Sequence, residues 1–88
     1  MIHKIKIEQK FFYDIASGLK SFDVRKNDRN YAVGDTLEMF EIDENMTNTG
    51  RGVIVRVNYI LPGGKYGIEE NYCVMGITNP KTVKYENT

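Results

Sequence analysis

Apolar and polar residues alternate along much of this chain, and such alternation is typical of β-strands that bury one face. The longest example covers 52–61, where Val53, Val55 and Val57 fall on one face and Tyr59 continues it. Shorter alternating stretches predict four further strands, at 2–7, 21–26, 36–42 and 71–78.

A different period interrupts the strands between Glu8 and Ser17. Apolar residues recur there three and four positions apart, which places them on one side of a helix of about ten residues. Gly18 follows directly and can take the left-handed conformation that ends many helices. We therefore expect one short helix, with an apolar stripe formed by Phe11, Phe12, Ile15 and Ala16.

Turn-forming residues such as Pro62-Gly63-Gly64 and Asn79-Pro80 separate the remaining elements. This order predicts a mainly β fold of the α+β class, with one or two short helices. Closing the strands fully or nearly into a small barrel would remove their exposed edges, with the helix plugging one end. The side chains expected in the core are Ile5, Phe12, Ile15, Phe22, Val24, Leu37, Val53, Val55, Val57, Val74 and Ile77.

The composition excludes several classes of protein. A length of 88 residues fits one domain, which we place at 1–78, followed by a polar C-terminal tail at 79–88. No apolar run approaches the ~20 residues of a membrane-spanning helix, and the alternating N-terminus does not resemble a signal peptide. The single cysteine, Cys73, excludes an internal disulfide framework. We expect a monomer in the cytoplasm of a bacterium or a phage-infected cell, without contact to a membrane.

Charge is balanced overall but unevenly distributed. The chain has twelve basic and twelve acidic residues, and this balance argues against a protein that coats nucleic acid through bulk electrostatics. Between Lys20 and Arg29, however, four basic residues accompany two acids, whereas 38–44 carries four acids and no base. The surface is therefore expected to have one basic and one acidic region.

The basic region contains the most informative motif, Gly18-Leu19-Lys20-Ser21-Phe22-Asp23-Val24-Arg25. Its glycine, lysine, acid and arginine resemble, at this spacing, the signature of the ASCH branch of the PUA-like fold. Tyr31, Val33-Gly34-Asp35, Thr49-Gly50-Arg51 and 72–77 extend the likeness to a small bacterial and phage ASCH-like family of unknown function. Asp23 departs from the wider pattern, which favours glutamate at its position.

The resemblance implies a PUA-like barrel with a cleft beside the helix, lined by the signature, and such domains are usually taken to bind RNA. Physically, Asp23 and Arg25 lie about 7 Å apart on one strand face, and Arg25 offers a planar fork to a phosphate or a carbonyl edge. We expect RNA or a modified nucleoside as the partner and no cofactor. The residues expected to bind it are Lys20, Asp23, Arg25, Lys26, Arg29 and Tyr31.

The resemblance also implies an alternative, because some small ASCH proteins hydrolyse the amide of acetylated cytidine. In that reading Lys20 and Asp23 are catalytic, although a carboxylate beside the lysine disfavours the neutral amine that a nucleophile needs. Asp23 and Arg25 can also be read as a structural ion pair, and a protein-interaction domain remains a third reading. His3, the only histidine, falls on the core parity and is expected to be structural, so no metal site is predicted.

Overall fold

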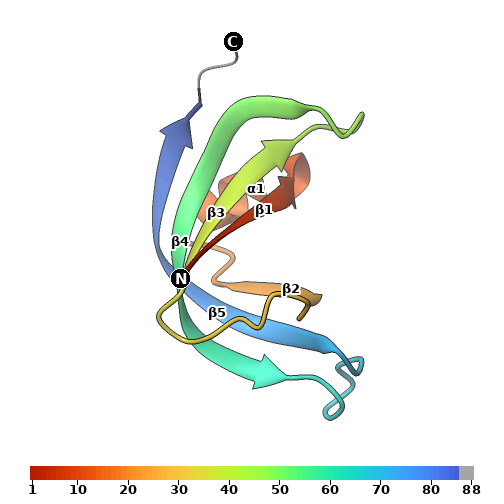
Figure 1. The fold of residues 1–88 in the computed structure, drawn as a ribbon. Coiled ribbons are helices and arrows are strands. Elements are labelled where there is room, and N and C mark those ends of the chain that lie inside the picture. Colours follow the sequence, from red (N-terminus) through yellow and green to blue (C-terminus); the bar gives the residue numbers. More distant parts are fainter. Residues whose placement is uncertain (86–88) are drawn as a thin grey trace.

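The structure, a computed structural model, describes residues 1–85. It contains one helix and five strands in the predicted order (Figure 1). Their bounds are β1 Ile2–Glu8, α1 Gln9–Ala16, β2 Phe22–Lys26, β3 Thr36–Ile42, β4 Asn48–Pro62 and β5 Tyr72–Lys84.

The five strands form one sheet in the order β1-β3-β4-β5-β2. Only β1 and β3 pair in parallel, and the other neighbours are antiparallel. The long strands β4 and β5 bend strongly, so the sheet curls into a half-barrel with α1 beside β1 and β3 (Figure 1). The predicted fold class is confirmed, but the sheet remains open between its edge strands β1 and β2.

The helix ends as the sequence predicts. Gly18 has a φ of +82°, and its amide donates to the carbonyl of Ile15 at 3.0 Å. Phe12 and Ile15 are buried, whereas Phe11 lies at the surface. The helix therefore covers the inner face of the sheet with a narrower apolar stripe than we expected.

Most of the predicted core is confirmed, including all three valines of β4. The prediction is wrong for Phe22 and Val24, which are 48% and 52% exposed, and for Val74, which is half-buried. On β2 the inward side chains are those of Asp23 and Arg25 instead. The buried apolar cluster consists of Ile5, Ile7, Phe12, Ile15, Tyr31, Leu37, Met39, Val53, Val55, Val57, Cys73, Met75 and Ile77.

Strand register explains the reversed faces of β2. Asp23 lies opposite Met75 and Arg25 opposite Cys73, and both partners point into the core. Directly opposed residues share one face of a sheet, so Asp23 and Arg25 must point inward as well. Alternation identified the two faces of β2 correctly but assigned them the wrong way round.

Two bulges alter the ends of the long strands. A register shift between Val57 and Tyr59 inserts an extra residue, which turns Tyr59 from the core face to solvent, where it is 66% exposed. A second shift near Asn79 lets β5 continue to Lys84, beyond Thr78, where we expected the last strand to end. The last residues of the predicted tail, 86–88, lie outside the described residues. No helix in the described part of the chain is long and apolar enough to cross a membrane.

Candidate functional site

The open seam between β1 and β2 is bridged by one side chain. The guanidinium of Arg25 donates through Nη2 to the backbone carbonyl of Lys6 at 2.9 Å, and through Nε to the Asp23 carboxylate at 2.5 Å. Asp23 is buried, so the guanidinium of Arg25 supplies the ion pair and hydrogen bond that stabilise a buried carboxylate. Both the functional and the structural interpretation of this pair are therefore compatible with its geometry.

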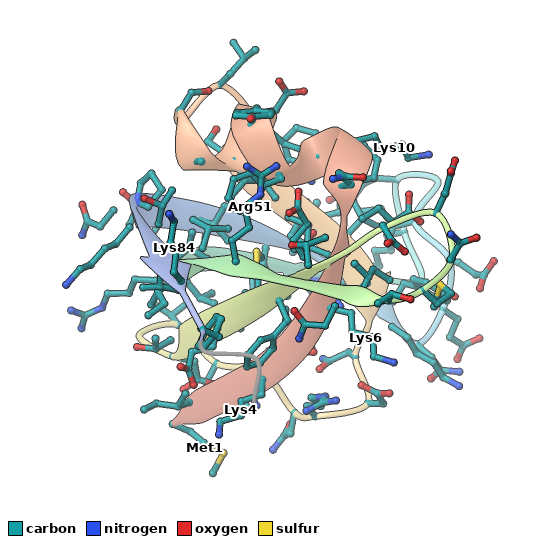
Figure 2. All side chains as sticks on the ribbon, turned by 90° about the horizontal axis from the view of Figure 1, so that it is seen from above. Met1, Lys4, Lys6, Lys10, Arg51 and Lys84 are labelled. Carbon is teal, nitrogen blue, oxygen red and sulfur yellow. The ribbon has the colours of Figure 1, made fainter. Side chains whose placement is uncertain are left out.

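A basic cleft of about 370 Å³ opens at this seam. Its size lies within the range of about 300–1,000 Å³ that is usual for ligand sites. Two of its cations, Lys4 and Lys6, come from β1, and Figure 2 shows them on the side of the molecule away from helix α1. The residues that line the cleft are Lys4, Ile5, Lys6, Arg25, Lys26, Asp28, Arg29 and Tyr31.

Tyr31, which lines the cleft, forms a buried cluster with His3 and Asp35. The ring of Tyr31 packs edge-on against His3, with 4.8 Å between the ring centroids. His3 Nε2 in turn lies 2.8 Å from the carboxylate of Asp35, which also accepts from the amide of Ala32. His3 is thus a hydrogen-bonded structural residue, as the sequence predicts.

The pKa values of two groups in this cluster, Asp35 and Tyr31, are shifted. The hydrogen bond with His3 is the main cause that lowers the pKa of Asp35 to about 2, against the opposing effect of burial. Burial raises the pKa of the Tyr31 phenol, although Arg25 and Arg29 act in the opposite direction. Asp35 therefore stays ionised over the physiological range, and Tyr31 stays neutral in an electropositive setting.

Lys20 lies outside the basic cleft. Its ammonium donates to the carbonyl of Phe22 at 2.8 Å, lies 3.6 Å from Asp23, and sits over the rings of Phe11 and Phe22. The side chain is 16% exposed and borders a hollow of about 130 Å³ near Gly18. That volume is below the usual range for a ligand site, and the amine is already engaged by four partners.

Cys73 is buried in the core behind Arg25. Burial, with Asp23 nearby, raises the pKa of its thiol. Since the thiolate is the reactive form, this position does not suit a nucleophile. Within residues 1–85, no group of three or more metal-binding side chains comes together.

The structure therefore brings together four of the six residues predicted to bind a ligand, namely Arg25, Lys26, Arg29 and Tyr31. Asp23 accepts a hydrogen bond from Arg25 but does not line the cleft, and Lys20 borders a separate hollow. Sequence reasoning missed Lys4 and Lys6, which join the site only because β1 and β2 are the two edges of one curled sheet.

A second charged pair was also missed. Glu41 is fully buried and accepts from the Thr49 hydroxyl and from Nε and Nη2 of Arg51. Arg51 stacks on Phe12 with 4.3 Å to the ring centroid, and Figure 2 shows it beside helix α1. Burial raises the pKa of Glu41, but Arg51 and Thr49 outweigh it and lower the value overall. The alternation of β3 could have predicted that Glu41 is buried, since it shares the core face with Leu37 and Met39.

Comparison with known proteins finds a family match and a similar phage protein. The family described as a domain of unknown function, DUF3850, matches residues 2–77. An uncharacterized 12.9 kDa protein in the GpA 3' region of Escherichia phage P2 is 41% identical over 56 residues. Those residues are 64% of this chain and 50% of the phage protein, so the chain spans about half the length of this curated relative.

Proposed function

The chain belongs to the DUF3850 family, and we propose that it is an RNA- or nucleoside-binding domain whose ligand occupies the basic cleft between β1 and β2. We further propose that this family is a branch of the ASCH group of PUA-like domains. The curled half-barrel, the helix beside it and the 18–25 motif support that assignment.

The observation that carries the proposal is the concentration of positive charge in one cleft. The chain as a whole has no net charge, yet the cleft contains five cations and a single acid, Asp28. Asp23 offsets part of the charge of Arg25, which leaves Lys4, Lys6, Lys26 and Arg29 as the main source of the local field. Such a cluster attracts phosphate groups even on a neutral protein.

The geometry also separates two roles within the cleft. Arg25 is fixed by contacts on both sides, so its planar guanidinium can recognise a phosphate or a carbonyl edge in a defined direction. Lys26 and Arg29 are exposed and can follow the backbone of a longer ligand. Tyr31, which is mostly buried, adds an aromatic residue to the lining of the cleft.

Hydrolysis of an acylated nucleoside is supported less well. Lys20, the residue that would carry it, has its amine held by Phe22 and Asp23 and borders only a small hollow. Binding is therefore the function that the geometry favours.

Titration of a labelled single-stranded RNA against the protein, followed by fluorescence anisotropy, tests the proposal. Lys6→Ala and Arg29→Ala should each weaken binding, whereas Lys65→Ala, which removes an exposed lysine outside the cleft, should not. If two to four phosphates are contacted, log K should fall with log salt concentration with a slope of roughly −1.4 to −2.8. Equal losses in all three variants, or no binding to RNA and nucleosides, would refute the proposal.

A further inference from the structure

The outer face of β2, β5 and the end of β4 carries apolar side chains that the core does not use. Phe22, Val24 and Tyr59 are each about half or more exposed, and their neighbours Leu61, Tyr72 and Val74 are half-buried. We call these six residues the outer apolar face. Helix α1 packs its buried residues on the opposite side of the sheet, so it does not cover them. Exposed apolar clusters of this kind mark interaction sites more often than chance.

Strand register shows that these residues are direct neighbours. Val24 lies opposite Val74, and Val74 lies opposite Leu61. One step further along, Phe22 and Tyr59 both lie opposite Gly76. The face is therefore a continuous surface across three strands.

The Phe22–Gly76–Tyr59 row places an exposed aromatic residue on each side of a glycine. Two strand spacings separate the backbones of Phe22 and Tyr59 by about 10 Å, and the absence of a Cβ at Gly76 makes room for the side chain of Asn58. A side chain at Gly76 would collide with the Asn58 carboxamide, which lies over it. The Asn58 amide, next to Tyr59, can both donate to and accept from the edge of a base. On the other side of the row, the ammonium of Lys20 lies 4.7 Å from the centre of the Phe22 ring.

Lys26 connects this aromatic row to the basic cleft. It lies on the outward face of β2, the same face as Phe22 and Val24, and it also lines the cleft. Alternate residues of a strand are about 7 Å apart, so Lys26 lies about 13 Å from the aromatic row. A nucleic-acid strand of several nucleotides can bridge that distance, whereas a free nucleoside cannot.

We propose that the ligand is a single-stranded RNA that runs from the basic cleft past Lys26 onto the outer apolar face, where its bases stack on Phe22 and Tyr59. This inference rests on the proposed function and narrows it from RNA or nucleoside to an extended strand. Sheet-borne aromatic rings stack on unpaired bases with little sequence preference, while cations hold the phosphates. The aromatic rings on this face, together with Lys26, which belongs both to the face and to the basic cleft, favour a nucleic acid over a protein partner.

The test compares an RNA of about eight nucleotides, within the ~4–16 typical of single-strand sites, with a dinucleotide. Phe22→Leu and Tyr59→Leu keep the apolar character but remove the ring, and Tyr59→Phe keeps the ring. The leucine variants should bind the longer RNA about 5- to 150-fold more weakly, which corresponds to about 1–3 kcal/mol per stacked base. Tyr59→Phe should match the parent, and dinucleotide affinity should stay unchanged in all three.

A direct readout is available because the chain has no tryptophan. The indole of Tyr59→Trp should be quenched when the longer RNA binds. If Arg29→Ala weakens RNA binding but the leucine variants and the indole do not respond, the further inference fails and the proposed function stands. If the parent binds nucleosides but no RNA, only the further inference fails, and if it binds neither, both fail. If sedimentation shows a dimer that Tyr59→Leu dissociates, the face is a protein interface and the inference is overturned.

Discussion

The guanidinium of Arg25 hydrogen-bonds to the backbone carbonyl of Lys6 across the open seam, at 2.9 Å. Backbone pairing does not close the sheet there, because β1 and β2 are its two edge strands. One side chain thus joins the edges of the half-barrel and at the same time contributes charge to the cleft. The cleft and the closure of the fold are therefore coupled through Arg25.

Arg25→Ala should lower the free energy of unfolding by about 1–3 kcal/mol, because it leaves the buried Asp23 carboxylate without its closest partner. Urea unfolding measures the loss. Removing both partners in Asp23→Asn/Arg25→Met should cost less than the sum of the two single variants. A single-variant loss below about 0.5 kcal/mol would mean that the pair contributes little to stability.

The sequence predicted the elements, their order and most of the core, because alternation and helical spacing are local properties. It could not decide which face of β2 points inward, since Phe22 and Val24 compete there with Asp23 and Arg25. Hydrophobicity favoured the first pair, but the register with β5 selected the second. Tyr59 was misplaced for a related reason, because a one-residue bulge reverses every later side chain.

The candidate site was predictable only in part. The motif and the residues that directly follow it pointed to Arg25, Lys26, Arg29 and Tyr31, which lie close together along the chain. Lys4 and Lys6 line the cleft because the sheet brings its two edge strands, β1 and β2, together, and no local sequence pattern encodes that arrangement. The same limit applies to charged pairs that form between strands.

Glu41 and Arg51 provide a second stability prediction. Glu41→Gln keeps the shape of the side chain but leaves the guanidinium uncompensated next to the core, so we expect a loss of about 1–3 kcal/mol. Lys10→Ala is the control, because Lys10 and Glu8 form an ion pair in which both side chains are mostly exposed. Breaking that surface pair should cost at most about 1 kcal/mol. Equal losses in urea unfolding would contradict a special role for the buried pair.

Acid should destabilise the fold partly through Asp35. Its pKa is lowered from 3.8 to about 2 in the folded protein, mainly by the hydrogen bond with His3. A lowered pKa means that the folded state favours the ionised form, so this contribution is complete above about pH 4 and is lost as the pH falls toward 2. In Asp35→Asn the contribution is absent. The difference in melting temperature between parent and variant should therefore shrink across that interval, and a constant difference would exclude Asp35 as its source.

Lys20→Met separates binding from catalysis. The substitution keeps most of the aliphatic bulk between Phe11 and Phe22 while removing the amine. The lost ion pair and cation–π contacts should lower stability by about 1 kcal/mol, so the variant should still fold. Thermal melting of both proteins checks this before any assay.

We expect neither the parent nor Lys20→Met to release the acyl group from a panel of N-acylated nucleosides, because the amine of Lys20 is held by the carbonyl of Phe22 and by Asp23. Time-resolved deacylation assays on both proteins provide the measurement. An enzyme that used Lys20 for proton transfer should lose at least about a hundredfold in rate on its removal. Clear turnover by the parent that disappears in a folded Lys20→Met variant would therefore make hydrolysis the primary function. Turnover that survives the substitution would place catalysis on another residue.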